Sequence, residues 1–364
     1  MSDFRVDQIT NRVGDAGTQI TGITTFSGTS GMIIPSGPTE MRGGRGRGVF
    51  GSGATPSGTN VMDLITIATT GNSTDFGDDH KIRQENYASF SSSIRGINAG
   101  GYNPAAFGSS TRGINAGGFN SPVSVSNINY FTFSSQGSMN DFGDLRTAVY
   151  SNAGCGNNVR GLSGGGTIGS PTNPHSAAIE YVNIASTGNA SVFGSLVAKP
   201  PHMNGASYLG SGIASPTRGM WHGGNAGPDT PNVRTIEYVT ISTLGEAVNF
   251  GEMTKRNAHT GCSNSTRGLI AAGQNPSNTN IIEYITIATE GDATDFGDVS
   301  ATKDYLGSCA SSIRGVFAGG QTPTKINVIE YVTMSTTGNT TDFGDLTVAR
   351  RFLQGCSDVH GGLG

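Results

Sequence analysis

An internal repeat with invariant spacings constrains the fold of this chain more than any other feature. Segments resembling Ile-Glu-Tyr-Val-Thr-Ile recur around Tyr181, Tyr238, Tyr284 and Tyr331, with looser copies at Leu64 and Tyr130. A glycine follows seven residues later, and five residues after it comes a Phe-Gly pair that begins at Phe76, Phe142, Phe193, Phe250, Phe296 and Phe343. Self-similarity at intervals of 46 to 66 residues indicates a repeat architecture.

Each repeat reads as a set of short strands. Ile-Glu-Tyr-Val-Thr-Ile is rich in β-branched and aromatic residues, as strands are. The glycine that follows suits a tight turn because it tolerates positive φ, and Thr-Asp-Phe-Gly-Asp forms the next strand. Residues 306–312 and 314–320, with their equivalents, supply two more strands. We find no helical period in the chain.

Four short strands in about 50 residues are typical of a propeller blade. The Gly-Gly pair that ends one strand resembles the kelch pattern. Six Phe-Gly units therefore predict an all-β, six-bladed kelch-like propeller over residues 47–364. Residues 350–358 repeat the strand that the first blade lacks, so we expect this C-terminal strand to close the ring.

One irregularity lengthens the first interval. Arg-Gly-Ile-Asn-Ala-Gly-Gly occurs at residues 95–101 and again at 112–118, and this duplication predicts a loop or an extra strand, with a seventh-blade remnant as the alternative. Loops at 164–177, 198–216 and 223–234 are long, and variable loops on a fixed scaffold are where binding usually occurs. The candidate surface-recognition residues are Tyr102, Phe107, Trp221 and His222. For Trp221, alignment with Phe317 and Ile270 favours packing over stacking on a sugar ring.

Residues 1–46 lie outside the repeat. They contain too few apolar side chains for a core of their own, which predicts an extended segment that needs a partner surface. Another subunit, or trimerisation of the chain itself, would supply that surface. The candidate docking side chains are Phe4, Ile9, Ile20, Ile23 and Phe26.

Composition excludes several functional classes. The chain has 364 residues and a net charge of −4, which gives no electrostatic reason to bind nucleic acid. It contains no run of about 20 apolar residues that could insert into a membrane. The first residues lack the basic start and apolar run of a secretory signal.

The motifs that could carry chemistry follow the repeat. Asp-Phe-Gly, the kinase metal-binding tripeptide, occurs four times, whereas a kinase needs it once and beside a His-Arg-Asp loop. The cysteines occupy equivalent strands around the ring, which predicts buried thiols without disulfides: Cys155, Cys262, Cys309 and Cys356. The histidines are scattered. We therefore expect no enzyme activity, no metal site and no cofactor.

The N-terminal run, with Pro-Ser-Gly-Pro-Thr-Glu at residues 35–40 and the arginine–glycine stretch at 42–48, resembles the opening of virion structural proteins of marine cyanobacterial phages. The Asp-Phe-Gly-Asp and Ile-Glu-Tyr-Val-Thr-Ile repeats resemble the kelch-like propellers of the same proteins. The resemblance implies a virion component assembled in the host cytoplasm and attached to other virion proteins through residues 1–46.

With the variable loops, this resemblance predicts a tail-fibre or tail-associated protein that recognises a host-surface glycan. A capsid or neck decoration protein without receptor binding remains an alternative. A carbohydrate-active propeller enzyme is a weaker one.

Overall fold

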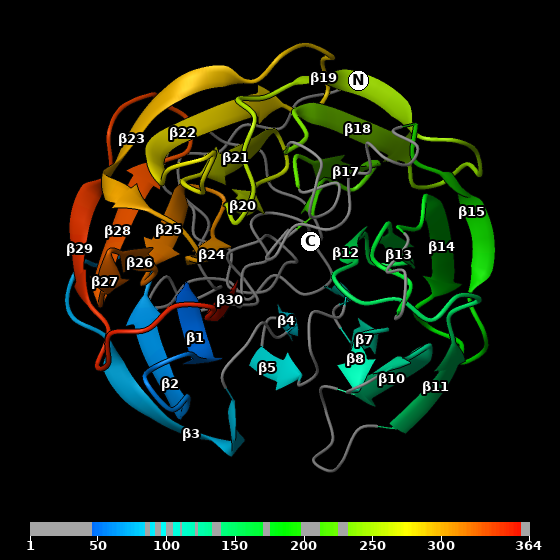
Figure 1. The fold of residues 1–364 in the computed structure, drawn as a ribbon, viewed down its shortest axis with the longest axis horizontal. Helices are drawn as coiled ribbons and strands as arrows, with labels where there is room; N and C mark the ends of the chain where they lie inside the picture. The colour runs from blue at the N-terminus through cyan, green and yellow to red at the C-terminus, as the bar shows by residue number, and fades with distance from the viewer. Residues whose placement is uncertain are drawn as a thin grey trace, which may run out of the picture.

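The computed structural model describes residues 46–83, 88–91, 96–99, 105–109, 111–120, 123–132, 140–169, 175–197, 212–224 and 232–357. These residues form strands and turns, with no helix among them. Figure 1 shows the strands arranged radially around a centre, as in a propeller. The predicted all-β, six-bladed β-propeller is confirmed.

Six four-stranded antiparallel sheets make the blades, numbered here 1 to 6 from the sheet that contains β1. The inner strands of blades 1 to 6 are β30 (Gln354–Ser357), β6 (Ala105–Gly108), β12 (Ala153–Gly156), β16 (Ile213–Ala214), β20 (Thr260–Ser263) and β24 (Gly307–Ala310). The second strands are β1 (Arg47–Gly53), β7 (Arg112–Ala116), β13 (Arg160–Gly164), β17 (Arg218–His222), β21 (Arg267–Ala271) and β25 (Arg314–Ala318).

The third strands are the Ile-Glu-Tyr segments: β2 (Thr59–Thr66), β10 (Asn127–Thr132), β14 (Ala178–Asn183), β18 (Thr235–Thr240), β22 (Thr279–Thr286) and β28 (Val328–Thr333). The outer strands carry the Phe-Gly pairs: β3 (Thr74–Arg83), β11 (Asn140–Asp144), β15 (Ser191–Ser195), β19 (Val248–Glu252), β23 (Thr294–Lys303) and β29 (Thr341–Asp345). Blade 1 is completed by β30, which pairs antiparallel with β1, so strands from opposite ends of the chain share one sheet.

The glycine of each Phe-Gly pair permits a β-bulge between the third and outer strands. In blade 6 the register shifts between Ile329 and Glu330, opposite Gly344. Gly344 has a φ of 146°, which side-chain-bearing residues rarely adopt. The bulge adds a local kink and twist to the sheet. The same shift occurs in all six blades, and the glycine has a positive φ in five of them.

The core lies between the blades. Phe343 of blade 6 packs against Ile65 and Ile67 of blade 1, and its ring meets Tyr331 edge to face at 5.9 Å. Four other outer-strand phenylalanines are packed in the same way against the following blade, and all five are 2–3% exposed. The repeated phenylalanine therefore fills the interface between one blade and the next.

The duplicated segment forms two hairpins. Its first copy supplies β5 (Gly96–Ala99), which pairs with β4 (Ala88–Ser91), and its second copy supplies β7 of blade 2. In the ring β4 contacts both β30 and β6, so the β4–β5 hairpin stands between blades 1 and 2 (Figure 1). The duplication thus makes extra strands. Smaller hairpins, β8 (Phe119–Asn120) with β9 (Val123–Ser124) and β26 (Gln321–Thr322) with β27 (Thr324–Lys325), lie within blades 2 and 6.

Candidate functional site: a variable-loop face and a buried polar network

The strand order gives the propeller two unlike faces. Turns from inner to second strands and from third to outer strands lie at one end of every blade, because all pairs are antiparallel. The turns from inner to second strands span three residues in blades 2 to 6. The turns from third to outer strands span seven residues in all six blades. We call this end the fixed-turn face.

The opposite end is the variable-loop face. The connections from second to third strands there range from 5 to 13 residues, and β8–β9 and β26–β27 belong to them. The connections from outer strands to the next inner strands lie at the same end. Pairs such as Tyr150–Thr167 and Asn257–Gln274 join the two kinds of connection across neighbouring blades. Variation in connection length is therefore concentrated on one face.

An aromatic and cationic cluster lies on the variable-loop face where blades 5, 6 and 1 meet. The rings of Tyr305 and Phe352 have centroids 4.3 Å apart, and the guanidinium of Arg351 lies 4.5 Å from the Phe352 ring. Arg351 also donates a hydrogen bond of 2.7 Å to Gln321 Oε1. Tyr305, Gln321 and Arg351 are half-buried, whereas Phe352 is buried.

The backbone at Tyr305 is part of the repeat rather than a local peculiarity. Tyr305 has a φ of 56°, a region that bulky residues rarely occupy. The equivalent positions before other inner strands behave alike, with φ between 52° and 58°: Ser151, Ala258 and Phe352. A conformation repeated in four connections is a requirement of the propeller architecture.

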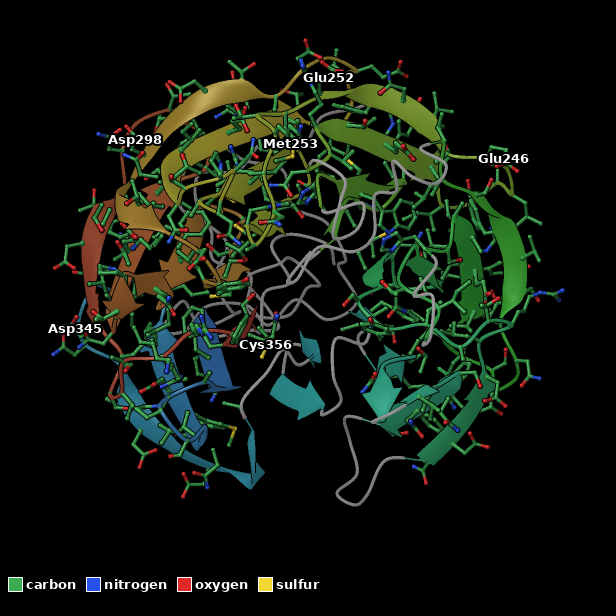
Figure 2. All side chains as sticks on the ribbon, viewed as in Figure 1. Glu246, Glu252, Met253, Asp298, Asp345 and Cys356 are labelled. Atoms are coloured by element: carbon green, nitrogen blue, oxygen red, sulfur yellow. The ribbon has the colours of Figure 1, made fainter. Side chains whose placement is uncertain are left out.

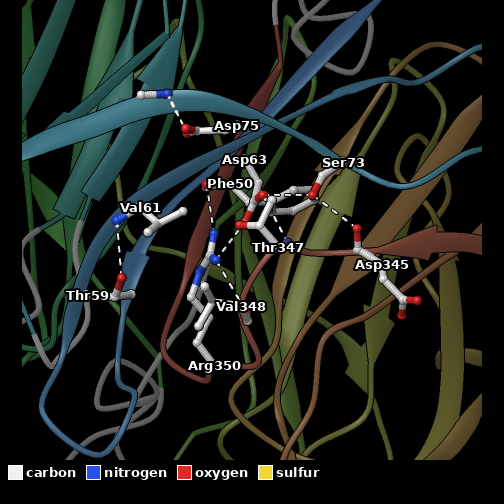
Figure 3. A network of polar contacts seen from close by, with 11 residues as sticks. Phe50, Thr59, Val61, Asp63, Ser73, Asp75, Asp345, Thr347, Val348 and Arg350 are labelled. Atoms are coloured by element: carbon white, nitrogen blue, oxygen red, sulfur yellow. Dashed lines mark hydrogen bonds and ion pairs between the residues drawn. The ribbon is translucent and has the colours of Figure 1, made fainter.

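A buried carboxylate connects blade 6 to blade 1 (Figure 3). Asp63 of β2 pairs with Arg350 at 2.6 Å and accepts hydrogen bonds from Ser73 Oγ and the backbone amide of Thr347. Arg350 also donates to the carbonyl oxygen of Phe50. Both charged side chains are fully buried, and burial lowers the pKa of the Arg350 guanidinium while Asp63 opposes that shift.

The same position carries an acid in four other blades. Glu283 pairs with Arg256 at 2.8 Å, and Glu330 pairs with Lys303. Glu237 and Glu180 instead accept backbone amides of the preceding blade, from Val197 and Arg146. Burial raises the pKa of Glu180, an effect that the Arg146 amide opposes. These acids join each blade to the connection that leads into it.

The arginine of the Arg-Gly pair reaches the following blade in blades 2 to 6. Arg314 donates from Nη1 to the carbonyl oxygen of Ile67 at 2.8 Å, and its guanidinium lies 4.2 Å from the Tyr331 ring. The same two contacts recur at Arg112, Arg160, Arg218 and Arg267. The repeated Arg and Tyr therefore have structural partners.

The glycine of the same pair makes room for a cysteine. A Cβ added at Gly48 would lie 2.9 Å from Cys309 Sγ, and one at Gly219 would lie 2.6 Å from Cys155 Sγ. All four cysteines are buried and free, as predicted for them. Burial raises the pKa of Cys155 and of Cys262 to about 12, so these thiols are protonated at neutral pH.

Three predicted recognition residues are buried, which corrects the sequence-based interpretation at those positions. Trp221 is 1% exposed and donates from Nε1 to the carbonyl oxygen of Ala153, so it has the packing role weighed above. Phe107 is 7% exposed and its ring fills the space above Gly161. His222 is 6% exposed. None of the three presents its side chain to a host surface, because the blade interface already buries each one.

His222 belongs to a buried pair. Its Nδ1 lies 3.0 Å from Nε2 of His259, which is completely buried. Burial lowers the pKa of His259 well below its usual value, and the nearby His222 and Arg256 lower it further. The pair joins His222 at the end of β17 to His259 in the connection before β20.

The remaining predicted residues fall outside the described part of the chain. These are Tyr102 and the docking candidates Phe4, Ile9, Ile20, Ile23 and Phe26. Sequence reasoning missed the buried acids and the Tyr305–Arg351 cluster. The acid could have been found, because Asp or Glu precedes the Tyr or Leu of the third strand in five of six repeats. The cluster could not, because its members come from different connections.

Neither metal-ligand geometry nor similarity to known proteins assigns a function to this chain. Within the described residues, no group of three or more His, Cys, Asp or Glu side chains is placed to hold a metal ion. In the same part of the chain no helix is long and apolar enough to cross a membrane. The chain matches no protein-family model and no curated protein sequence.

Proposed function

We propose that this protein is a non-enzymatic structural component of a phage particle, located on or near the tail, whose variable-loop face recognises the host surface. The observation that carries this proposal is the concentration of length variation on one face, above a ring whose opposite face repeats the same short turns. Loops on a rigid scaffold can diversify without disturbing the core.

The polar side chains of the repeats support a binding role rather than catalysis. The acid, the arginine and the cysteine of the repeat are engaged between blades, as Asp63, Arg314 and Cys309 illustrate. Figure 2 shows the labelled acidic residues Glu246, Glu252, Asp298 and Asp345 spread around the outer rim rather than gathered together. Catalysis by general acid and base requires groups held within reach of one another.

Within the variable-loop face, the Tyr305–Arg351 cluster is the proposed contact for a surface glycan. An aromatic ring with a polar handle suits stacking on a sugar, while guanidinium and amide groups donate hydrogen bonds to its hydroxyls. Residues 1–46 would hold the propeller on the particle through other virion proteins or through trimerisation. The kelch-like character of the repeats belongs to the same proposal, since it rests on the resemblance of their sequences.

A competition experiment tests this function. Host cells pre-incubated with the purified full chain should adsorb fewer phage particles, and Tyr305→Ala or Arg351→Ala should compete about tenfold less well, as expected for a central contact residue. Ile313→Ala is the matched control, because Ile313 is 59% exposed on a fixed turn of blade 6.

The outcomes distinguish receptor binding from decoration and from enzyme activity. Equal competition by all variants would contradict the role of the cluster. No competition by the unaltered chain, with the protein located on the capsid or neck, would indicate decoration without receptor binding. Turnover of host polysaccharide that one carboxylate substitution abolishes would indicate an enzyme instead.

A further inference from the structure

Five junctions between blades share one set of backbone contacts. The turn glycine of each third-to-outer turn donates its amide to the phenylalanine carbonyl of the preceding blade, as Gly291 does to Phe250 at 2.8 Å. The residue after that glycine accepts an amide through its side chain, as Asp292 does from Glu252 at 2.9 Å. The next residue donates its own amide to the same strand, as Ala293 does to the Glu252 carbonyl at 2.8 Å.

We call this sequence the junction motif: Gly, then Asp, Asn or Glu, then Ala, Ser or Thr. It occurs with all three contacts at Gly71-Asn72-Ser73, Gly188-Asn189-Ala190, Gly245-Glu246-Ala247, Gly291-Asp292-Ala293 and Gly338-Asn339-Thr340.

In blade 1, the outer-strand residues that would receive the contacts of a following junction motif have no such motif against them among the described residues. Phe76 is 49% exposed, whereas the five equivalent phenylalanines are 2–3% exposed. A Cβ added at Gly77 would meet no atom within 4 Å, whereas a Cβ at any equivalent glycine would collide with the next blade's turn glycine. The strand edge at Phe76, Gly77 and Asp78 therefore has the residues of a junction, but its junction contacts are not made within the described part of the chain. We call it the open edge of blade 1.

The neighbouring unit explains the opening. The β4–β5 hairpin follows blade 1 in the ring, and within the described residues β5 pairs only with β4. In every four-stranded blade the corresponding Arg-Gly strand pairs with a third strand of the Ile-Glu-Tyr type. Within the part of the chain that the structure describes, the unit at this position thus has the two inner strands of a blade without a third strand or its turn. A matching segment would have to supply, in order, an apolar residue, an acid, one further residue at the Tyr position, Ile or Val, and Thr. The junction motif would then follow after a short turn.

Residues 6–16 have this pattern. They read Val-Asp-Gln-Ile-Thr-Asn-Arg-Val-Gly-Asp-Ala, and Gly14-Asp15-Ala16 matches the junction motif. The first five align with Ile282-Glu283-Tyr284-Ile285-Thr286 of β22, and the last three with Gly291-Asp292-Ala293. The turn between the two parts is one residue shorter than in the repeat. We propose that residues 6–16 add to β5 of their own chain as the missing third strand and dock their junction motif on the open edge of blade 1.

The register follows from the other blades, where the arginine faces Thr in five blades and Asn183 in blade 3, and the glycine faces Val or Ile in five blades and Phe131 in blade 2. In blade 5 these pairs are Arg267 with Thr286 and Gly268 with Ile285. Ile9 therefore faces Gly96, and Thr10 faces residue 95. The Gly14 amide donates to the Phe76 carbonyl, and the Asp15 carboxylate accepts the Asp78 amide.

The connecting chain is long enough for this arrangement. Twenty-nine residues separate Ala16 from Gly46, where the described chain begins. Fully extended they span about 95 Å, and as a flexible chain they have a root-mean-square span of roughly 30 Å. Such a tether keeps the segment at high effective concentration near its own blade, which favours the same chain over a second copy.

This assignment divides the N-terminal segment by function. Residues 6–16 complete the ring, while Ile20, Ile23 and Phe26 remain for attachment to the particle. The inference does not rest on the proposed function, because it concerns contacts within one chain.

Labelling of an introduced thiol tests the proposal in the full chain. Phe76→Cys should react with a maleimide about tenfold or more slowly than Val192→Cys, which is 54% exposed on the outer strand of blade 3. Adding Ile9→Lys should release this protection, because the aligned Ile285 is buried. Adding Thr10→Lys is the matched control and should leave the protection intact, since the aligned Thr286 is exposed. The native thiols contribute little background, because all four are buried.

Hydrogen exchange provides a second readout that leaves Phe76 unchanged. The amides of Gly96–Ala99 and Asp78 should exchange about tenfold or more faster in the Ile9→Lys variant than in the unaltered chain, and at unchanged rates in Thr10→Lys. Full reactivity of Phe76→Cys in the intact chain, or exchange insensitive to Ile9→Lys, would overturn the proposal. Protection that disappears on dilution would assign the segment to a second copy, and would overturn the proposal for the same chain.

Discussion

At the scale of single residues, the repeated positions make the contacts that join neighbouring blades. The glycine after the Arg accommodates a neighbouring side chain in five blades, the glycine after each Phe lies at a bulge, and the acid of the third strand, present in five of six repeats, receives the incoming connection. The sequence predicted the buried thiols. It favoured packing for Trp221, as the structure has it, but it did not predict the burial of His222, because burial there depends on the blade that packs against it.

The buried ion pairs give a first prediction at this scale. Lys303→Met should lower the free energy of unfolding by about 3–5 kcal/mol, because it leaves Glu330 charged and buried without its partner. The double variant Lys303→Met/Glu330→Gln should recover part of that loss. Urea unfolding followed by circular dichroism measures both. Arg234→Met is the control, because the Arg234–Glu252 pair is largely exposed and its loss should cost about 1 kcal/mol or less. A cost at Lys303 as small as that at Arg234 would contradict the argument.

The buried histidine pair gives a second prediction. Because the pKa of His259 is lowered in the folded state, the unfolded chain binds a proton near pH 6.5 that the folded chain does not. Stability is therefore complete above pH 6.5 and declines as the pH falls below it, by up to about 1.4 kcal/mol per pH unit until the folded-state pKa is reached. Unfolding measured between pH 7 and 5 should show this slope, and His259→Gln should reduce it. An unchanged slope in His259→Gln would assign the pH dependence to other groups.

At the scale of elements, the strands could be predicted because each repeat combines β-branched runs with fixed turns. The four-stranded blades follow from that pattern, as β22 and β28 illustrate. For the duplication, the sequence predicts a loop or an extra strand, and its first copy forms the strand β5. The separate β4–β5 hairpin could not be predicted, since the first Arg-Gly copy lacks the third strand that identifies a blade. Whether β5 gains that strand depends on distant parts of the chain.

The closing strand gives a third prediction. Removal of residues 350–364 should abolish the single cooperative thermal transition, because it deletes β30 and the Arg350 partner of Asp63. Removal of residues 358–364 alone should leave the melting temperature nearly unchanged, because β30 ends at Ser357. Thermal unfolding by circular dichroism compares the two. Normal melting of the shorter chain would show that β30 is dispensable for the ring.

At the scale of the whole molecule, the propeller separates stability from variation. Its blades are joined by contacts that recur around the ring, and its connections vary in length on a single face. This separation suits a protein whose binding surface changes while its fold does not. It supports a binding component of a particle more than an enzyme, because the repeated polar residues already serve the blade interfaces.

We propose that the protein belongs to a phage particle and presents its variable-loop face outward. The most direct test is immunogold labelling of intact particles with an antibody against the folded propeller. Label at the tail is the expected result, and Tyr305→Ala should reduce the binding of those antibodies that block adsorption. Absence of label on particles, despite detection of the protein in infected cells, would contradict it.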